Sequence, residues 1–312
     1  MIRLGNVVSA FVTKFPKRSR VRNSRRCTGV AAKDPESTLD SELFQSKILS
    51  HVPAMAESLL EHGYYTTTDV LPKSTIQLLR NQSIFLRFEK KRFEQSFSET
   101  IDSNSGLVKE RFDKEGVYCC EPDGQDFYDA TDLITYMSIL LQTLPESLNT
   151  EWQSTIGAPS SLPLLSNQSF NAKLAVTEHG GSKYPLHVDN PQGRAVGDIR
   201  KLTCILYLNP QHDETTDGGF IRLFLPSTND NDPWKILDLS PIGGRLLVFW
   251  SDEIPHEVLP TSLIECPTHK TKDRYALTIW IPTSDEACLH SNKSKFYDLK
   301  DRVFASAESS EK

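Results

Sequence analysis

A histidine and an aspartate stand two residues apart in the segment His187-Val188-Asp189. On an extended chain residues i and i+2 point to the same side, so the imidazole and the carboxylate would converge on one point. This pair alone is a weak signal, because such pairs are common on protein surfaces. It gains meaning with a second histidine, because two histidines and one carboxylate on one face of a metal leave the opposite positions open, as in non-haem Fe(II) oxygenases.

His256 is the best candidate for that second histidine. It follows a turn and begins a predicted strand within SDEIPHEV (251–258). The other histidines stand on a predicted front helix, in loops or in the C-terminal tail, where solvated side chains are expected. The sequence therefore predicts an iron site formed by His187, Asp189 and His256.

An arginine could hold the co-substrate of such a site. If that co-substrate is 2-oxoglutarate, its far carboxylate needs a cation, and the planar guanidinium pairs with carboxylates in a bidentate way. Arg274 opens the apolar strand RYALTIW (274–280), where a buried charge needs a partner. Tyr207 could offer its hydroxyl to the same carboxylate. The alternatives are a solvated or ion-paired arginine and an ordinary core tyrosine.

Short apolar segments separated by turn residues fill the second half of the chain and would position these side chains. They are rich in Val, Ile, Leu, Tyr and Phe and cover residues 173–177, 202–208, 220–224, 245–249, 256–259 and 275–281. Evenly spaced strands of this kind predict a sandwich or barrel of the jelly-roll type. We expect an α+β, mainly β fold whose core is a double-stranded β-helix (jelly-roll) over residues 171–286.

A helical front precedes this core over residues 40–170. Apolar residues from Phe44 to Leu59 recur at spacings of three or four, which predicts a helix that Pro53 divides or kinks and that Gly63 ends. A short strand at 64–68 and helices at about 72–88 and 131–144 follow. We expect an irregular loop over 94–116, helices packed on one face of the core, and a polar, frayed tail within residues 287–312.

Charge is divided unevenly along the 312-residue chain, whose net charge is −6. Residues 1–33 contain nine Lys or Arg and no acid, whereas residues 34–312 hold 26 basic and 41 acidic side chains, a net of −15. The acidic body will not attract nucleic acid. The longest apolar runs are far shorter than the roughly 20 residues of a membrane span, so we expect no span. The six cysteines form no CxxC pair and indicate reduced thiols inside a cell.

The basic head over residues 1–33 is expected to lie outside the fold. Its composition is typical of an organelle transit peptide, for a mitochondrion or a plastid. A nuclear localisation patch within residues 17–26, or a disordered tail without an address in the cytoplasm, remain alternatives.

Residues 173–286 resemble the catalytic domain of the prolyl 4-hydroxylases, and within them the hypoxia-inducible-factor prolyl hydroxylases. The resemblance rests on segments that occur in the family's order: HVDNPQG (187–193), LTCILYLN (202–209), DGGFIRLF (217–224), RLLVFWSDEIPHEV (245–258) and RYALTIW (274–280). The segment HGYYTTTDVLPKSTIQLLRNQ (62–82) is weakly similar to the family's lead-in strand and helix.

The resemblance implies roles for several residues. They are His187, Asp189 and His256 as iron ligands, Arg274 and Tyr207 for the 2-oxoglutarate C5 carboxylate, Thr278 and Trp280 for the pocket near the iron, and Arg200 and Tyr184 for the peptide substrate. It also implies O2 as oxidant and L-ascorbate for restoring Fe(II). For Arg200 and Tyr184, surface or packing roles are equally open.

Two features depart from the family pattern. The family usually has a tyrosine where the best-aligned residue here is Thr177, which puts in doubt one contact to the co-substrate or to a bound water. The loop between His256 and Arg274, within residues 260–273, and the segment GRAVGDIR (193–200) are extended. Both are expected to flank the site entrance and to alter peptide selectivity.

The reaction implied is hydroxylation of a prolyl residue in a protein or peptide, with release of succinate and CO2. A 2-oxoglutarate oxygenase acting on another residue or a small molecule is the second hypothesis. A non-catalytic jelly-roll binding module is the third, although such a module would have no reason to keep two histidines, an aspartate and an arginine in this pattern.

Overall fold

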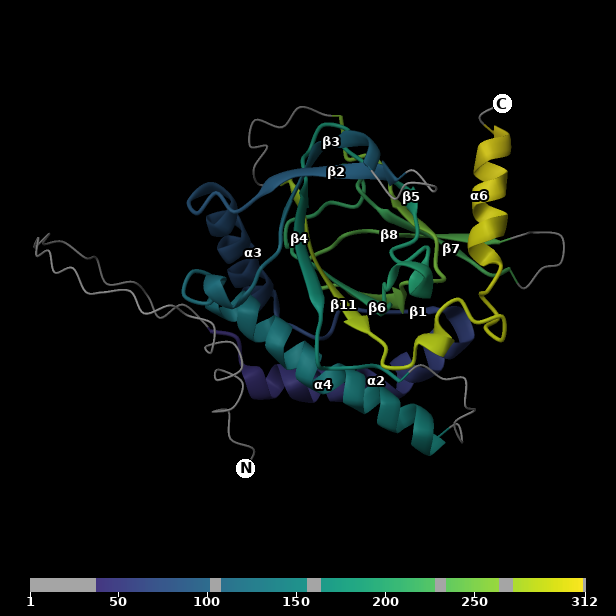
Figure 1. Cartoon of the computed structure of the whole chain (residues 1–312). Helices are drawn as coiled ribbons and strands as arrows, with labels where there is room; N and C mark the ends of the chain where they lie inside the picture. Colours follow the sequence, from purple (N-terminus) through teal and green to yellow (C-terminus); the bar gives the residue numbers. More distant parts are fainter. Residues whose placement is uncertain (1–37, 102–107, 156–163, 228–233, 264–271, 311–312) are drawn as a thin grey trace, which may run out of the picture.

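The structure, a computed structural model, describes residues 38–101, 108–155, 164–227, 234–263 and 272–310 (Figure 1). The predicted targeting segment 1–33 and residues 264–271 of the extended loop lie outside these ranges. No helix in the described part of the chain combines the length and the hydropathy that crossing a membrane requires.

Two antiparallel sheets form the core. The larger has the strand order β1 (Tyr64–Thr67), β9 (Leu246–Trp250), β6 (Arg200–Tyr207), β11 (Arg274–Pro282), β4 (Asn171–Thr177), β3 (Val108–Cys120) and β2 (Glu94–Ile101). The smaller has the order β5 (Tyr184–His187), β10 (His256–Val258), β7 (Ile221–Leu225) and β8 (Lys235–Leu239). This arrangement, with helices against the larger sheet, confirms the predicted jelly-roll core.

Three helices cover the larger sheet: α2 (Ser41–His62), α3 (Lys73–Phe88) and α4 (Thr131–Thr155). In Figure 1, α2 and α4 lie side by side along one side of the barrel. The Trp250 indole of β9 donates to the Leu59 carbonyl of α2, and the Trp152 indole of α4 donates to the Ala56 carbonyl. These buried hydrogen bonds attach the helices to the sheet and to each other. Short 3-10 turns complete the fold at Gly124–Asp126, Gly193–Val196 and Glu286–Cys288.

Strand β11 shows how the larger sheet separates a packing face from a site face. Successive side chains of a strand point to opposite sides. Arg80 of α3 lies over the ring of Tyr275, with 4.7 Å from its guanidinium carbon to the ring centroid, so Tyr275 faces the helices. Arg274, Thr278 and Trp280 consequently face the interior between the two sheets.

Helix α2 is continuous, so Pro53 does not divide it, whereas a kink at Pro53 stays a prediction. The Asp40 side chain accepts from the Leu43 amide at the start of the helix, and Gly63, with φ +79°, ends it. A proline within a helix removes one hydrogen bond. Here the buried side chains on both sides of Pro53, from Phe44 to Leu59, pack into the same core, which holds both halves of the helix against it.

The segment 94–116 is not a loop, because it contains β2 and most of β3, which pair as a hairpin at the edge of the larger sheet. Backbone pairing rather than apolar burial defines these strands, so their sequence lacks the hydrophobic pattern on which the expectation relied. The C-terminal tail also differs from the expectation. Helix α6 (Leu299–Ser310) follows residue 298 and buries Leu299 and Val303. Strand β8 was not predicted either.

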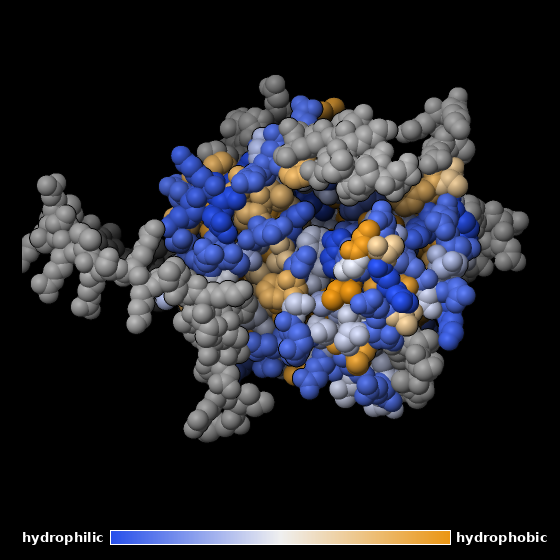
Figure 2. Space-filling view, viewed as in Figure 1, coloured by the Kyte–Doolittle hydropathy of each residue, from blue (hydrophilic) through white to orange (hydrophobic). Residues whose placement is uncertain are grey.

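Hydrophilic side chains cover much of the face seen in Figure 2, with hydrophobic ones in separate patches between them. This distribution agrees with the acidic composition of the chain outside its first 33 residues.

We expect Gly63→Ala to destabilise the protein more than Gly197→Ala. Both glycines have positive φ, which costs an alanine about 1–2 kcal/mol. A Cβ on Gly63 would lie 2.7 Å from Ile254 Cδ1, whereas nothing lies within 4 Å of one on Gly197. Overpacking should add about 1–3 kcal/mol at Gly63 only. Urea unfolding of the two variants measures the difference, and equal losses would contradict this packing.

Candidate active site

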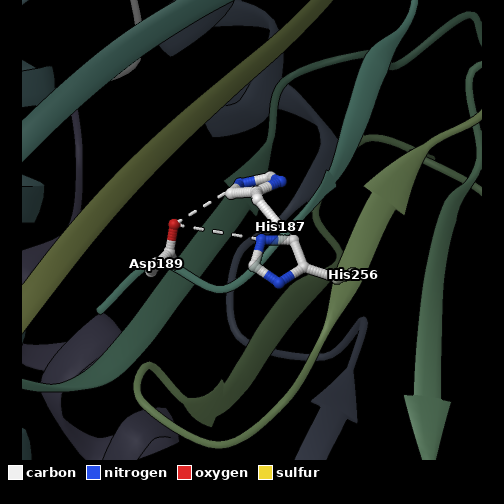
Figure 3. Close-up of side chains that lie close together, drawn as sticks. All are labelled: His187, Asp189 and His256. Atoms are coloured by element: carbon white, nitrogen blue, oxygen red, sulfur yellow. Dashed lines mark ion pairs between the residues drawn. The ribbon is translucent and has the colours of Figure 1, made fainter. Parts of the chain in front are cut away.

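His187, Asp189 and His256 come together between the two sheets (Figure 3). His187 ends β5 and His256 begins β10, and the two residues are direct partners in the antiparallel pairing of these strands. Asp189 follows β5 by two residues. One ligand atom from each of the three side chains lies within 4.8 Å of the other two. Asp189 Oδ1 is 3.7 Å from His187 Nε2 and 3.9 Å from His256 Nε2.

Backbone carbonyls orient both imidazole rings. His187 Nδ1 lies 2.8 Å from the Pro185 carbonyl, and His256 Nδ1 lies 3.0 Å from the Ile254 carbonyl. A carbonyl can only accept, so each Nδ1 carries a proton and Nε2 is the ring nitrogen that faces the cluster. This is the usual way in which a protein fixes the tautomer of a metal-binding histidine.

The charge states of the cluster suit a cation. Burial, together with the charge of His187, lowers the pKa of His256 to about 4, so this ring is neutral near pH 7. Burial opposes ionisation of Asp189. The contacts with His187 and His256 nevertheless hold the pKa of the Asp189 carboxyl below its ordinary value. Two imidazoles and a carboxylate facing one point form a donor set that fits a divalent transition metal.

Two donors from the larger sheet hold the other oxygen of Asp189. The Thr203 hydroxyl donates to Asp189 Oδ2 at 2.7 Å, and the Trp280 indole N–H donates to the same oxygen at 2.9 Å. Thr203 and Trp280 are opposite partners on β6 and β11. The Thr203 hydroxyl also lies 2.7 Å from the Ser251 hydroxyl. These contacts leave Oδ1 to face the histidines.

Arg274 lies in the interior and is 7% exposed. Its Nε donates to the Gly219 carbonyl at 2.9 Å, and its Nη2 lies 3.4 Å from the Tyr207 hydroxyl. Burial lowers the pKa of Arg274, and within the described ranges no carboxylate forms an ion pair with it. A buried cation without an anion is costly, so this position fits an anionic ligand.

The remaining predicted residues line the same interior. Thr278 faces it two residues before Trp280, and Thr177 lies directly opposite Arg274 in the pairing of β4 with β11. The Tyr184 ring centroid is 4.6 Å from that of His187.

Arg200 is already engaged by neighbouring residues. It pairs with Asp198, and its Nη2 donates to the Asp189 carbonyl at 2.6 Å. Its guanidinium carbon lies 5.3 Å from the centroid of the Trp280 ring. These contacts position the backbone of Asp189, whereas the peptide contact expected for Arg200 stays a prediction.

Sequence reasoning did not identify three side chains of this region: Thr203, Ser251 and Lys114. Thr203 stands in the segment LTCILYLN and could have been found from its alternation with Tyr207, because residues 203, 205 and 207 share one face of a strand. Lys114 stands in the segment expected to be a loop, and its Nζ lies 3.5 Å from the centroid of the Tyr184 ring. No signal in the sequence places it there.

Residues 172–282 match the family model of the 2OG-Fe(II) oxygenase superfamily. This part of the chain is therefore similar to the oxygenase domains of that superfamily.

Several curated proteins to which this part of the chain is similar are named prolyl hydroxylases. The chain is 38% identical over 129 residues to the human Prolyl hydroxylase EGLN3, covering 41% of this chain and 46% of that protein. It is 39% identical over 116 residues to the Hypoxia-inducible factor prolyl hydroxylase of Caenorhabditis elegans, covering 37% of this chain and 14% of that protein. The chain thus spans less than half the length of these relatives.

The fold is shared with solved prolyl hydroxylases at lower identity. A prolyl-4-hydroxylase of Pseudomonas putida superposes with a TM-score of 0.53 at 24% identity, covering 75% of this chain and 100% of that one. A prolyl hydroxylase from Trichoplax adhaerens, solved with a hypoxia-inducible factor peptide, gives 0.54 at 24% identity, covering 77% and 93%. Both support the jelly-roll architecture.

Replacing His256 by Ala should abolish stoichiometric iron binding, because the remaining His187 and Asp189 cannot supply a three-ligand face. His62→Ala is the control, because His62 is half-exposed at the end of α2. Metal content after anaerobic loading and desalting measures the effect. Full iron occupancy in His256→Ala would contradict the assignment of His256 as an iron ligand.

Trp280→Phe and Thr203→Val should each lower iron affinity by about 10–100-fold, because each removes one donor that orients Asp189. Thr203→Val keeps the size of the side chain and Trp280→Phe keeps an aromatic ring, so the fold should remain. Competition with a chelator measures the affinity. An unchanged affinity in both variants would mean that Asp189 needs no such support.

Proposed function

We propose that this protein is an Fe(II)- and 2-oxoglutarate-dependent dioxygenase that hydroxylates a prolyl residue of a protein or peptide substrate and releases succinate and CO2. The observation that carries the proposal is the convergence of His187, Asp189 and His256 in the same interior as Arg274, which has no acidic partner among the described residues. The resemblance of this domain to prolyl hydroxylases supports the choice of substrate.

In this proposal His187, Asp189 and His256 hold Fe(II), and Arg274 binds the far carboxylate of 2-oxoglutarate. When bound, iron and 2-oxoglutarate supply the oxidative decarboxylation that activates O2 for insertion into a C–H bond. Thr203 and Trp280 keep Asp189 oriented, and the carbonyls of Pro185 and Ile254 keep both histidine rings in the tautomer that binds metal.

Exposure indicates the side from which substrate enters. The side chain of His187 is 29% exposed, whereas those of Asp189 and His256 are 9% and 5% exposed. Tyr184, beside His187, therefore stands at the entrance, in keeping with its proposed contact with the peptide. Thr278 would line the co-substrate pocket, with Tyr207 donating to the same carboxylate as Arg274. L-ascorbate would restore Fe(II) after turnover without hydroxylation.

Residues 1–33 are proposed to act as a targeting segment for an organelle, because they are basic and free of acid. A fluorescent fusion of the full chain should then collect in an organelle, and a fusion without residues 1–33 should disperse. Nuclear accumulation of the full chain would favour the basic patch within residues 17–26 instead, and identical distributions would favour a tail without an address.

Arg274→Lys should raise the 2-oxoglutarate concentration needed for half-maximal rate at least about tenfold, and Arg274→Ala should raise it further. Lysine keeps the charge but loses the bidentate geometry, and a charge-assisted hydrogen bond is worth roughly 1.5–3 kcal/mol. Iron content should stay nearly unchanged. Arg222→Ala is the control, since Arg222 pairs with Asp238 on the small sheet. If the rate of Arg274→Ala depends on 2-oxoglutarate concentration as that of the wild type does, Arg274 does not bind the far carboxylate.

The reaction itself is tested with purified full-length protein, Fe(II), 2-oxoglutarate and a lysate of the source cells. We expect succinate to form and mass spectrometry to find peptides that gain one oxygen atom on proline. Oxygen on another residue or on a metabolite would support the second hypothesis. Absence of both succinate and oxidised products with full iron loading would favour a binding module.

A further inference from the structure

Two lysines, Lys114 and Lys173, lie beside the candidate active site and have no role in the chemistry proposed above. Lys173 is the direct partner of Thr278 in the pairing of β4 with β11, so the two side chains share the interior face of the larger sheet. Lys114 lies where β3 is irregular. Gln95 of β2 pairs with Tyr118 and Phe97 with Asp113, so β3 carries extra residues between these pairs. Such bulges redirect side chains and are frequent beside active sites.

Each lysine lies over an aromatic ring that contacts the triad His187, Asp189 and His256. Lys114 Nζ is 3.5 Å from the centroid of the Tyr184 ring, whose centroid is 4.6 Å from that of His187. Lys173 Nζ is 5.8 Å from the centroid of the Trp280 ring, whose N–H binds Asp189. The two ammonium groups therefore stand one aromatic ring away from the proposed metal ligands.

Neither lysine has a carboxylate partner in the portion of the chain that the structure describes. Two other partly or fully buried lysines have one: Lys201 pairs with Asp252, and Lys272 pairs with Asp217. Burial and, to a smaller extent, the charge of Lys173 lower the pKa of Lys114 to about 8. Two partly buried like charges are unfavourable together unless an anion joins them.

We propose that Lys114 and Lys173 form a carboxylate-binding subsite that takes an aspartate or glutamate side chain of the substrate near the hydroxylated proline. The inference rests on the proposed function and specifies its substrate class. An extended peptide rises about 3.3 Å per residue, so a carboxylate held over Tyr184 would belong to a residue about two or three positions from the proline. The aromatic rings of Tyr184 and Trp280 would flank the peptide between the hydroxylated proline and the bound carboxylate.

Peptide binding without turnover tests this subsite. The probes are nine-residue peptides with one central proline, capped at both ends and fluorescently labelled, in which Glu or Gln occupies one position at a time and Ala the rest. Binding to the full-length protein loaded with Mn(II) and 2-oxoglutarate is measured by anisotropy. We expect at least one position within three residues of the proline at which Glu binds about tenfold more tightly than Gln.

Variants then locate the source of that preference. In Lys114→Gln/Lys173→Gln the preference for Glu should fall to within about twofold, whereas Lys114→Arg/Lys173→Arg should keep most of it, because the charges remain. Lys73→Gln, at an exposed position that begins α3, should bind like the wild type. The subsite is refuted if no Glu peptide binds better than its Gln counterpart, or if the double Gln variant keeps the preference.

The proposed function and the subsite can fail separately in this design. A preference for Glu peptides that depends on the two lysines, without formation of hydroxyproline, would support the subsite and contradict the proposed reaction. Hydroxylation of proline without a preference for Glu would support the reaction and contradict the subsite.

Discussion

The pairing of β5 with β10 is the constraint on which the site depends. It places His187 and His256 directly opposite each other, and their ring centroids are 4.2 Å apart. Asp189 completes the cluster because the chain after His187 brings its carboxylate beside both rings, 3.7 and 3.9 Å from their Nε2 atoms. A shift of one residue in this pairing would turn one histidine to the outer face of the small sheet. The site therefore requires the register of a short strand pair to be secured by the rest of the fold.

The larger sheet holds Asp189 in place from the opposite side of the interior. Thr203 and Trp280, partners on neighbouring strands, hold one oxygen of Asp189, and Arg200 holds its backbone carbonyl. Trp250 attaches this sheet to α2, and Trp152 attaches α4 to α2, so packing on the outer face of the sheet stabilises the hydrogen bonds on its inner face. Arg274 shares that inner face, where it is buried without an acidic partner among the described residues.

Sequence patterns predicted the parts of the molecule in which apolar strands carry, or lie next to, the candidate site residues. The core strands carrying Thr203, Trp280 and Arg274 are continuous apolar runs, and the motif around His187 and Asp189 has a fixed spacing. The hairpin of β2 and β3 could not be predicted in this way, because backbone pairing at a sheet edge leaves no apolar alternation. Lys114 was missed for the same reason, since its place beside Tyr184 depends on an irregularity within that hairpin. Pro53 does not divide α2, because buried side chains on both sides of it pack into the same core.

Three side chains are proposed to hold one Fe(II) to which 2-oxoglutarate can bind. An anaerobic titration of the metal-free protein with Fe(II) in the presence of 2-oxoglutarate tests this most directly, because an iron-bound keto acid gives a visible charge-transfer absorption band. We predict a band that saturates at one iron per chain and requires 2-oxoglutarate. No band at full iron loading, or the same band in a variant lacking His256, would contradict the proposed site.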